Sequence, residues 1–348
     1  MRYGAIAENA LEDRMLVAPG GPRAMLDTLM PLLMAKTIMV ATRLELFEKL
    51  AERPMRTVEL CDELGLDEEM LKLLMRMLWG SGYVSRQDDV YHISEFARGN
   101  LVRAAGARCR AHVGMYEALW ENVGHMEDAI RTGSGIDVHR TLRSEREWDV
   151  YQESMREDAR TTARLILPFI PVKPGATRLL DIAGSHGLYG AALCRAHPPL
   201  RSEVLDLPSA VPAAVAIARS EGIDDIVTHR GGDALVDDLG TQNDVVLINN
   251  LLHHFTREQS ITLLHRVRQS MSANATVAIW ELCPSDSDGP PNLLNDSVAL
   301  FFRVTSGGRC HSSAEYADWL KKAGFVNVRV RRPGSTPQQA IVTGRTPA

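Results

Sequence analysis

An acidic residue followed by two closely spaced glycines is the first feature of this sequence that could serve chemistry. Asp181 lies in the apolar run 178–183, and Gly184 and Gly187 follow before a segment of helical composition. A strand, a tight turn and a helix in this order leave backbone N–H groups pointing outward at a strand's carboxyl end, where parallel sheets bind ligands. Glycines let the backbone approach a ligand closely. Nucleotide and dinucleotide binders share this spacing.

A second acidic residue, Asp206, narrows the class of ligand. It ends the next apolar run and is followed by Leu207 and Pro208. A carboxylate at this position accepts hydrogen bonds from both hydroxyls of a ribose. The two motifs together predict a nucleoside site. A dinucleotide oxidoreductase fits less well, because the glycines form no G-x-G-x-x-G pattern.

The region that must position these residues begins near Thr177 and alternates apolar strands with helices. This alternation is typical of a mostly parallel sheet covered on both faces. We expect strands at 178–183, 202–206, 225–230, 244–249, 275–281, 325–331 and 338–343. We expect helices at 186–196, 208–221, 257–272, 292–304 and 313–323.

The preceding region has a different pattern. Two short helices and a hairpin are expected between Thr57 and Ile93, which is the order of a winged helix. A DNA-binding regulator is therefore an alternative function. Over residues 56–100, however, nine acidic side chains outnumber five basic ones, and the second helix opens with Asp67-Glu68-Glu69. Negative charge there opposes contact with phosphates and disfavours DNA binding.

Length and composition bound the remaining possibilities. The 348 residues suit two domains, and the net charge of -5 gives no electrostatic reason to expect nucleic acid or an anionic membrane as a partner. The five cysteines are scattered without a C-x-x-C spacing, so we expect neither a disulfide framework nor a metal site. A reducing cytoplasm fits this cysteine usage.

The N-terminal helices have unusually apolar sequences. The stretch 29–47 is interrupted by Pro31, Lys36 and Arg43, which favours a buried amphipathic helix over a membrane span. Helices at 5–16 and 24–50 carry more apolar surface than a small domain can cover, which predicts a dimer. Two further long helices, at 107–132 and 145–168, carry aromatic and methionine side chains.

The order of these elements resembles the two-domain, S-adenosylmethionine-dependent small-molecule O-methyltransferases, a family of plant phenolic and bacterial natural-product enzymes. The resemblance extends from about Met25 to Thr343. It implies an α/β fold, with a Rossmann-like class I methyltransferase sheet preceded by a mainly α-helical, winged-helix-like dimerisation domain. The corresponding divisions are a dimerisation domain at 1–105, linking helices that contribute to the substrate pocket at 106–172, and an S-adenosylmethionine-binding domain at 173–348.

The resemblance also implies a set of cofactor-binding residues. The family's glycine motif lies on Asp181 to Gly187, with Ala183 and Ser185 at two of its four glycines. Asp206 would bind the ribose and Asp233 would lie near the adenine. Asn249 stands where plant relatives often have lysine. The full expected set is Asp181, Ala183, Gly184, Gly187, Asp206, Leu207, Asp233, Ala234 and Asn249.

His253 matches the family's general base, and Glu281 matches a carboxylate that flanks it. Cys310 stands where the family has a second flanking glutamate. The residues alone leave other interpretations open. His253 and His254 could cap a helix that starts near Thr256, and Glu281 could be a hydrogen-bonded acid at a strand end.

The implied acceptor is a small, apolar and aromatic molecule. The residues expected to contact it are Met115, Trp120, Trp148, Met155, Asn250, His254 and Phe302. Transfer to nitrogen or carbon, or electrostatic use of the cofactor without methyl transfer, remain alternatives, as does a non-enzymatic regulator. The expected partners are the acceptor and a second copy of the chain bound through the N-terminal helices, with no nucleic acid or membrane.

Overall fold

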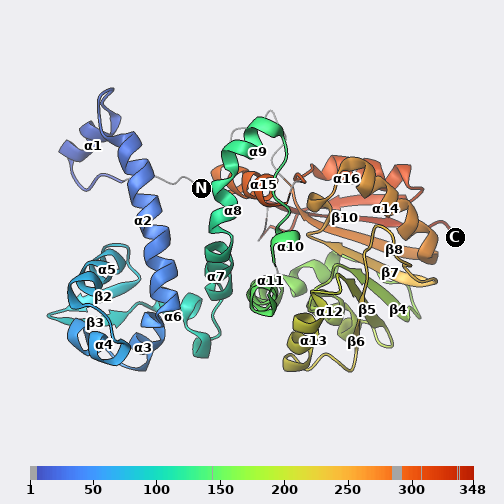
Figure 1. The fold of residues 1–348 in the computed structure, drawn as a ribbon. Helices are drawn as coiled ribbons and strands as arrows, with labels where there is room; N and C mark the ends of the chain where they lie inside the picture. Colours follow the sequence, from blue (N-terminus) through green and yellow to red (C-terminus); the bar gives the residue numbers. More distant parts are fainter. Residues whose placement is uncertain (1–5, 143, 284–291, 307, 335, 337) are drawn as a thin grey trace. The chain divides into compact units, whose positions relative to one another are not determined.

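A seven-stranded sheet of order β6-β5-β4-β7-β8-β10-β9 forms the centre of the second half of the chain (Figure 1). Strands β4 to β8 are parallel, whereas β10 runs antiparallel to both β8 and β9. The α/β class with a mostly parallel sheet is confirmed. The strands are β4 (Arg178–Ile182), β5 (Arg201–Asp206), β6 (Val227–Gly231), β7 (Asn243–Asn249), β8 (Met271–Leu282), β9 (Val326–Arg331) and β10 (Gln339–Arg345).

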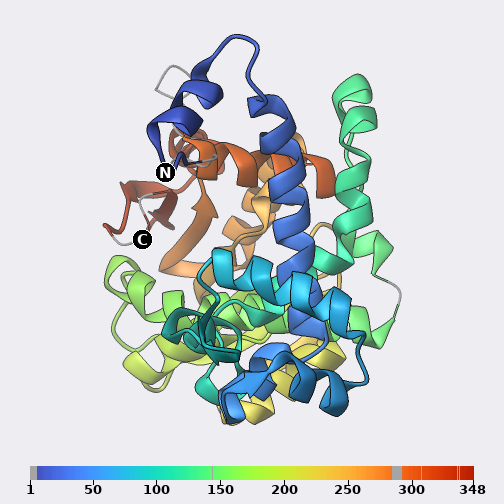
Figure 2. The ribbon, with the colours of Figure 1, turned by 90° about the vertical axis from the view of Figure 1, so that its left-hand side faces the viewer.

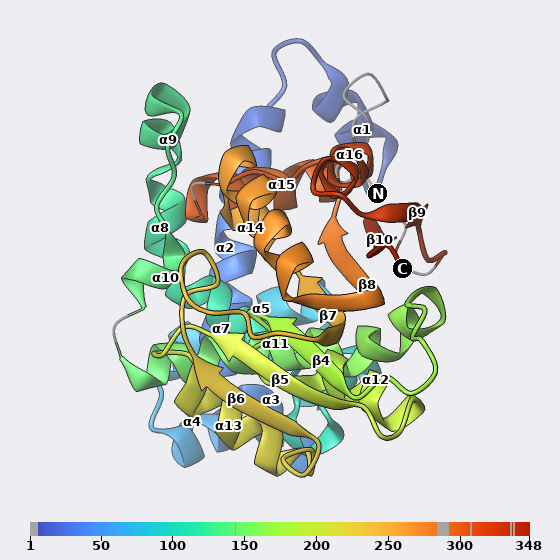
Figure 3. The same cartoon turned by 90° about the vertical axis from the view of Figure 1, so that its right-hand side faces the viewer.

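Alternating residues of each central strand face two separate cores. Leu179 packs with α11 and α12, whereas its neighbour Leu180 packs with α14 and α16 on the other face. Figure 3 shows the sheet between these layers, with α12 and α13 against one face and α14 against the other. The helices are α11 (Glu145–Ile166), α12 (Leu188–Ala196), α13 (Val211–Ser220), α14 (Arg257–Ser270), α15 (Leu293–Thr305) and α16 (Ser313–Lys322).

The computed structural model describes residues 6–142, 144–283, 292–306, 308–334, 336 and 338–348. It divides into two units, Met1–Glu117 and Ala118–Ala348. The first unit contains α1 (Ala10–Val17), α2 (Arg23–Arg43), α3 (Leu46–Glu52), β1 (Met55–Arg56), α4 (Thr57–Leu64), α5 (Glu68–Gly80), β2 (Val84–Gln87), β3 (Val90–Ile93), α6 (Glu95–Leu101) and a one-turn helix, Arg103–Ala105. The expected helix-turn-helix and hairpin are present as α4, α5, β2 and β3.

Two helices expected to be continuous are broken. The segment 24–50 divides into α2 and α3 at Glu45, which adopts a left-handed backbone conformation and pairs with Arg103. The segment 107–132 divides into α7 (Arg110–Ala118), α8 (Trp120–Gly124) and α9 (Met126–Thr132). Gly124 is a poor helix former at one of these breaks. A short α10 (Val138–Thr141) and the long α11 follow.

Helix α2, the long blue helix of Figure 2, departs from the expected buried amphipathic helix. Only Met39, Ala41 and Thr42 of α2 are buried, and the side chains of its first half are exposed. By length and composition α2 could cross a membrane, and it is the one described helix that could. Helices of water-soluble proteins can have the same length and composition, so these two properties are weak support for a membrane span.

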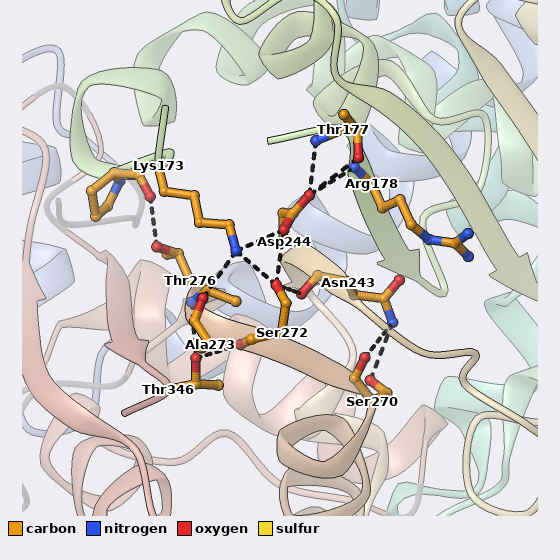
Figure 4. Close-up of polar contacts among 12 residues, drawn as sticks. Lys173, Thr177, Arg178, Asn243, Asp244, Ser270, Ser272, Ala273, Thr276 and Thr346 are labelled. Carbon is orange, nitrogen blue, oxygen red and sulfur yellow. Dashed lines mark hydrogen bonds and ion pairs between the residues drawn. The ribbon is translucent and has the colours of Figure 1, made fainter. Parts of the chain in front are cut away.

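A polar cluster ties together the amino ends of the central strands (Figure 4). The Asp244 carboxylate at the start of β7 accepts hydrogen bonds from the backbone N–H groups of Thr177 and Arg178, at 2.8 and 3.2 Å. Its other oxygen lies 2.8 Å from Lys173 Nζ and 2.8 Å from Ser272 Oγ. Burial alone would raise the pKa of Asp244, but these bonds outweigh it and lower the pKa to about 2.

We therefore expect Asp244→Asn to lower the free energy of unfolding by about 1–3 kcal/mol at neutral pH, because Lys173 loses its charged partner. The depressed pKa means that Asp244 stabilises the fold fully above about pH 4 and loses this effect as the pH falls towards about 2. Urea unfolding of both proteins should show a difference that shrinks over that interval. A difference that is constant with pH would contradict the assignment.

Candidate active site

A cavity of about 420 Å³ lies at the carboxyl ends of four neighbouring parallel strands. The segments that follow β4, β5, β6 and β7 all contribute to its wall, and α10 and α11 close one side. This is the edge at which open parallel sheets bind ligands, because backbone N–H groups and strand-end side chains converge there. Every residue that lines the cavity belongs to the second unit.

Asp206 organises the part of the cavity between β4 and β5. Its two carboxylate oxygens accept hydrogen bonds from the backbone N–H groups of Ser185, at 2.9 Å, and Leu207, at 2.7 Å. The Ser185 hydroxyl donates in turn to Gln152 of α11. Burial raises the pKa of Asp206, and the two backbone donors oppose this rise. A carboxylate oxygen accepts more than one hydrogen bond, so Asp206 keeps capacity for hydroxyl groups of a ligand.

The turn after β4 holds two non-glycine residues in the left-handed region. Ala183 has φ of 54° and Ser185 has φ of 53°. These positions correspond to glycines in the motif that the sequence resembles, so the backbone keeps a glycine-like conformation at some cost in strain. A Cβ on Gly187 would come within 2.6 Å of Val227 Cγ1, and one on Gly184 within 2.3 Å of Asp181 Cγ. Packing inside the protein therefore also requires these glycines, and their close approach to a ligand stays a prediction.

Asp181 lies directly beneath this turn and is completely buried. Neither of its carboxylate oxygens makes a hydrogen bond of ordinary geometry with the described residues, although the nearby backbone N–H of Gly190 favours the charged form. Burial raises the pKa of Asp181 to about 7. Asn249, at the end of β7, lines the cavity and likewise leaves both side-chain polar atoms without a partner. Buried polar groups without partners are uncommon and are typical of ligand sites.

His253 and Glu281 form a buried pair beside the cavity. His253 lies on a one-turn helix, Leu252–His254, after β7, and Glu281 lies near the end of β8. The distance from His253 Nδ1 to Glu281 Oε2 is 2.8 Å. The other oxygen, Oε1, accepts from the backbone N–H groups of Leu251 and Leu252 at 2.8 and 2.6 Å. Glu281 therefore fixes both the histidine ring and the backbone that carries it.

The structure excludes helix capping by His253 and His254, and it agrees with Glu281 as a hydrogen-bonded acid at a strand end. Thr256 is the N-cap of α14, and its hydroxyl accepts from the backbone N–H of Gln259, so neither histidine caps that helix. Glu281 is a hydrogen-bonded acid at a strand end, and one of its partners is the histidine. A carboxylate bound to Nδ1 keeps the proton of a neutral ring on that nitrogen and leaves Nε2 as the basic site.

The ring of Phe302, from α15, covers His253. The two rings are stacked, with centroids 4.1 Å apart. A Cβ on Gly308 would come within 1.9 Å of the His253 carbonyl oxygen, so the segment after α15 lies directly against this backbone. Burial raises the pKa of Cys310 to about 12, and the nearby charge of Glu281 adds to the shift. The Cys310 thiol stays protonated and adds no second negative charge.

The cavity brings together most of the expected site residues. Of the expected cofactor set, it is lined by Ala183, Gly184, Asp206, Leu207, Asp233, Ala234 and Asn249. Of the expected acceptor set, it is lined by Trp148, Met155, Asn250 and His254. Asp181, Gly187, His253, Glu281 and Phe302 are not among the described lining residues. Met115, on α7, and Trp120, on α8, are not among the described lining residues, and their contact with an acceptor stays a prediction.

The cavity also contains residues that the sequence did not indicate. They are Asp137, His139, Gln152, Asp158, His186, Tyr189 and Gln259. Three of them, His139, Gln152 and Asp158, come from α10 and α11, whose polar residues carry no motif. The described His, Cys, Asp and Glu side chains include no group of three or more that could hold a metal ion.

Two family models match different parts of the chain and together cover most of it. Residues 116–326 match the O-methyltransferase domain, and residues 25–103 match the O-methyltransferase dimerisation domain.

Curated relatives include two Streptomyces enzymes. The 3-hydroxy-5-methyl-1-naphthoate 3-O-methyltransferase of Streptomyces sahachiroi is 26% identical over 93% of this chain and 95% of its own length. The L-tyrosine C(3)-methyltransferase of Streptomyces lavendulae is 25% identical, with 87% of each chain covered. Among solved structures, human N-acetylserotonin methyltransferase in complex with SAM has a TM-score of 0.82 at 18% identity, over 99% of this chain and 100% of that one.

The raised pKa of Asp181 predicts a stability effect opposite in sign to that of Asp244. Because the folded protein disfavours the Asp181 carboxylate, its contribution to stability falls as the pH rises from about 4 to about 7. Asp181→Asn removes the charge, so without ligand the variant should gain about 1–3 kcal/mol on the wild type across this interval. Urea unfolding tests this, with Asp244→Asn as the control. A difference in the free energy of unfolding between Asp181→Asn and the wild type that does not increase with pH would contradict this prediction.

Proposed function

Because the chain belongs to the O-methyltransferase family, with both its dimerisation domain and its methyltransferase domain, we propose that His253 is its general base and Glu281 the residue that positions it. The observation that carries this proposal is the buried 2.8 Å contact between the two side chains at the ligand edge of the sheet. The enzyme is an S-adenosylmethionine-dependent methyltransferase, and its favoured acceptor atom is the oxygen of a hydroxyl group. When bound, S-adenosylmethionine supplies a methyl group on a positively charged sulfur.

The residues of the cavity fit this cofactor. Asp206 has carboxylate capacity left for ribose hydroxyls, and Asp233 and Ala234 line the part of the cavity next to β6 that we assign to the adenine. Asn249 and the buried carboxyl of Asp181 supply polar atoms without partners. A positively charged ligand nearby would favour the ionised form of Asp181 and offset the cost of its burial.

His253 addresses the main chemical obstacle of methyl transfer to a phenol. A phenol has a pKa of about 10 and an imidazole one of about 6.5, so proton transfer between them in water is unfavourable by roughly 4.8 kcal/mol. Glu281 stabilises the imidazolium that forms when His253 Nε2 takes the proton, and it keeps the ring oriented. A base positioned in this way typically contributes ~10²–10⁴-fold to the rate.

The acceptor we propose is a small aromatic molecule. Trp148 and Met155 line the cavity, and the ring of Phe302 lies against the base. These side chains come mainly from 106–172, which supports a linking segment that contributes to the substrate pocket between the dimerisation domain (1–105) and the methyltransferase domain (173–348). The relatives named above are an O-methyltransferase of a naphthoate and a C-methyltransferase of tyrosine. A hydroxyl acceptor is favoured here because a buried histidine–carboxylate pair suits removal of a phenolic proton.

His253→Ala should lower kcat by about 10²–10⁴-fold, because the acceptor hydroxyl loses its base. Calorimetry with S-adenosylhomocysteine should show nearly unchanged affinity, since His253 is not among the residues assigned to the cofactor. Labelled S-adenosylmethionine and a panel of phenols, indoles and pyridines supply the assay. The exposed His265 of α14, changed to alanine, is the matched control. Equal turnover by His253→Ala and the wild type would remove His253 from the mechanism.

We also propose that the chain is a homodimer joined through its N-terminal helices. The first half of α2 exposes apolar side chains at Met25, Leu29, Met30, Leu32 and Leu33. Exposed apolar surface of this kind is typical of an interface. A dimer would bury these side chains without a membrane. No disulfide joins the cysteines in the described part of the chain, which fits a reducing cytoplasm.

Leu29→Glu combined with Leu33→Glu should convert the dimer to monomers at micromolar concentration, because each charge would have to be buried in the interface. Size-exclusion chromatography with light scattering measures this directly. Val236, an exposed side chain of the second unit, provides the control substitution Val236→Glu. A wild-type monomer, or a double variant that stays dimeric, would refute this interface.

A further inference from the structure

Two more histidines lie beside the proposed base. The ring of His254 is 4.1 Å from that of His253, centroid to centroid. On its other side, His254 meets the ring of His139 edge-on at 4.7 Å. Both His139 and His254 line the cavity, and His253 lies next to His254. The wall next to the base is therefore built from imidazole rings.

His139 is held firmly by its surroundings. Its Nε2 lies 3.1 Å from the Tyr151 hydroxyl, and its Nδ1 lies 3.5 Å from an Asp137 oxygen. The Trp148 ring stacks on it with an angle of 22° between the ring planes. Because the Tyr151 hydroxyl and the Trp148 ring both hold it, His139 acts as a rigid support against which His254 packs.

His254 has hydrogen-bonding capacity that the described residues do not use. Its Nδ1 is buried and has no partner among them. Burial lowers the pKa of His254 far below its usual value, and the neighbouring His253 and His139 lower it further. The ring is therefore neutral and offers one N–H donor and one acceptor nitrogen. Buried hydrogen-bonding capacity left unused costs about 1–3 kcal/mol.

Beside these polar groups, the cavity is lined by the apolar side chains of Trp148, Met155 and Phe255. In such a pocket a small number of polar groups determines which ligand binds and how it is oriented. An aromatic acceptor with its reacting hydroxyl at His253 would bring the adjacent ring substituent against His254. A substituent on a distant ring carbon would not reach that position.

Building on the proposed function, we infer that His254, supported by His139 and Tyr151, selects aromatic acceptors that carry a second oxygen next to the hydroxyl that is methylated. Either a hydroxyl or a carbonyl oxygen meets this requirement, because a neutral imidazole both donates and accepts. His254 is thus a specificity-determining residue, distinct from the base.

Two naphthalene diols test the inference. In one the hydroxyls are on adjacent carbons, and in the isomer they are on different rings, so size and composition are the same. The wild type should prefer the adjacent diol by about 10-fold or more in kcat/KM, the value of one hydrogen bond in a buried site. His254→Leu should bring this ratio close to one, and His254→Asn, which keeps a donor and an acceptor, should restore part of it. His265→Leu is the control and should keep the full preference.

The outcomes separate this inference from the proposed function. A wild type that transfers labelled methyl to both diols with equal efficiency overturns the inference and leaves the function standing, as does a His254→Leu variant that keeps the preference. If neither diol is methylated, their relative affinity for the complex with S-adenosylhomocysteine, measured by calorimetry, decides the inference by the same ratio. Binding of S-adenosylhomocysteine by each variant verifies that it is folded.

Discussion

The buried carboxylate of Glu281 is the interaction on which the candidate active site depends. One oxygen holds the backbone N–H groups of Leu251 and Leu252, and the other holds the ring of His253. The same side chain therefore shapes the segment after β7 and orients the histidine that the segment carries. Glu281 lies on β8, the longest strand of the sheet, with β7 and β10 on either side. The His253–Glu281 pair is therefore held by a strand that is hydrogen-bonded on both edges.

The sheet determines which residues meet at this site. Parallel strands end at the same edge, so Asp181, Asp206, Asn249 and Glu281 converge although up to 100 residues separate them in the chain. Helix α11 adds Trp148, Tyr151 and Met155 from one side. The residues proposed for cofactor and acceptor thus meet at one edge of the sheet because parallel strands end there.

Much of this arrangement was predictable from the sequence. The strands lie within a few residues of their expected positions, because the central ones are apolar runs, whereas β6 and β9 at the edges carry polar residues as well. The breaks at Glu45 and near Gly124 were not predictable, since the first depends on a partner 58 residues away, Arg103. The meeting of His139 with His254 depends on how α10 lies against the segment after β7, and no local pattern encodes that. Gly187 was identified for its spacing, and the spacing could not show that Val227, on a strand 40 residues later, also leaves no room for a side chain there.

The two ends of the central strands differ in how their polar side chains are paired. At the amino ends, the polar side chains of Lys173, Asp244 and Ser272 satisfy one another, and at the carboxyl ends Asp181 and Asn249 are left unsatisfied. The side chains that stabilise the fold and those of the candidate site therefore lie at opposite ends of the same strands. The loops at the carboxyl ends can therefore be redesigned for new acceptors. The polar cluster around Asp244, at the amino ends, would continue to keep the strands in register.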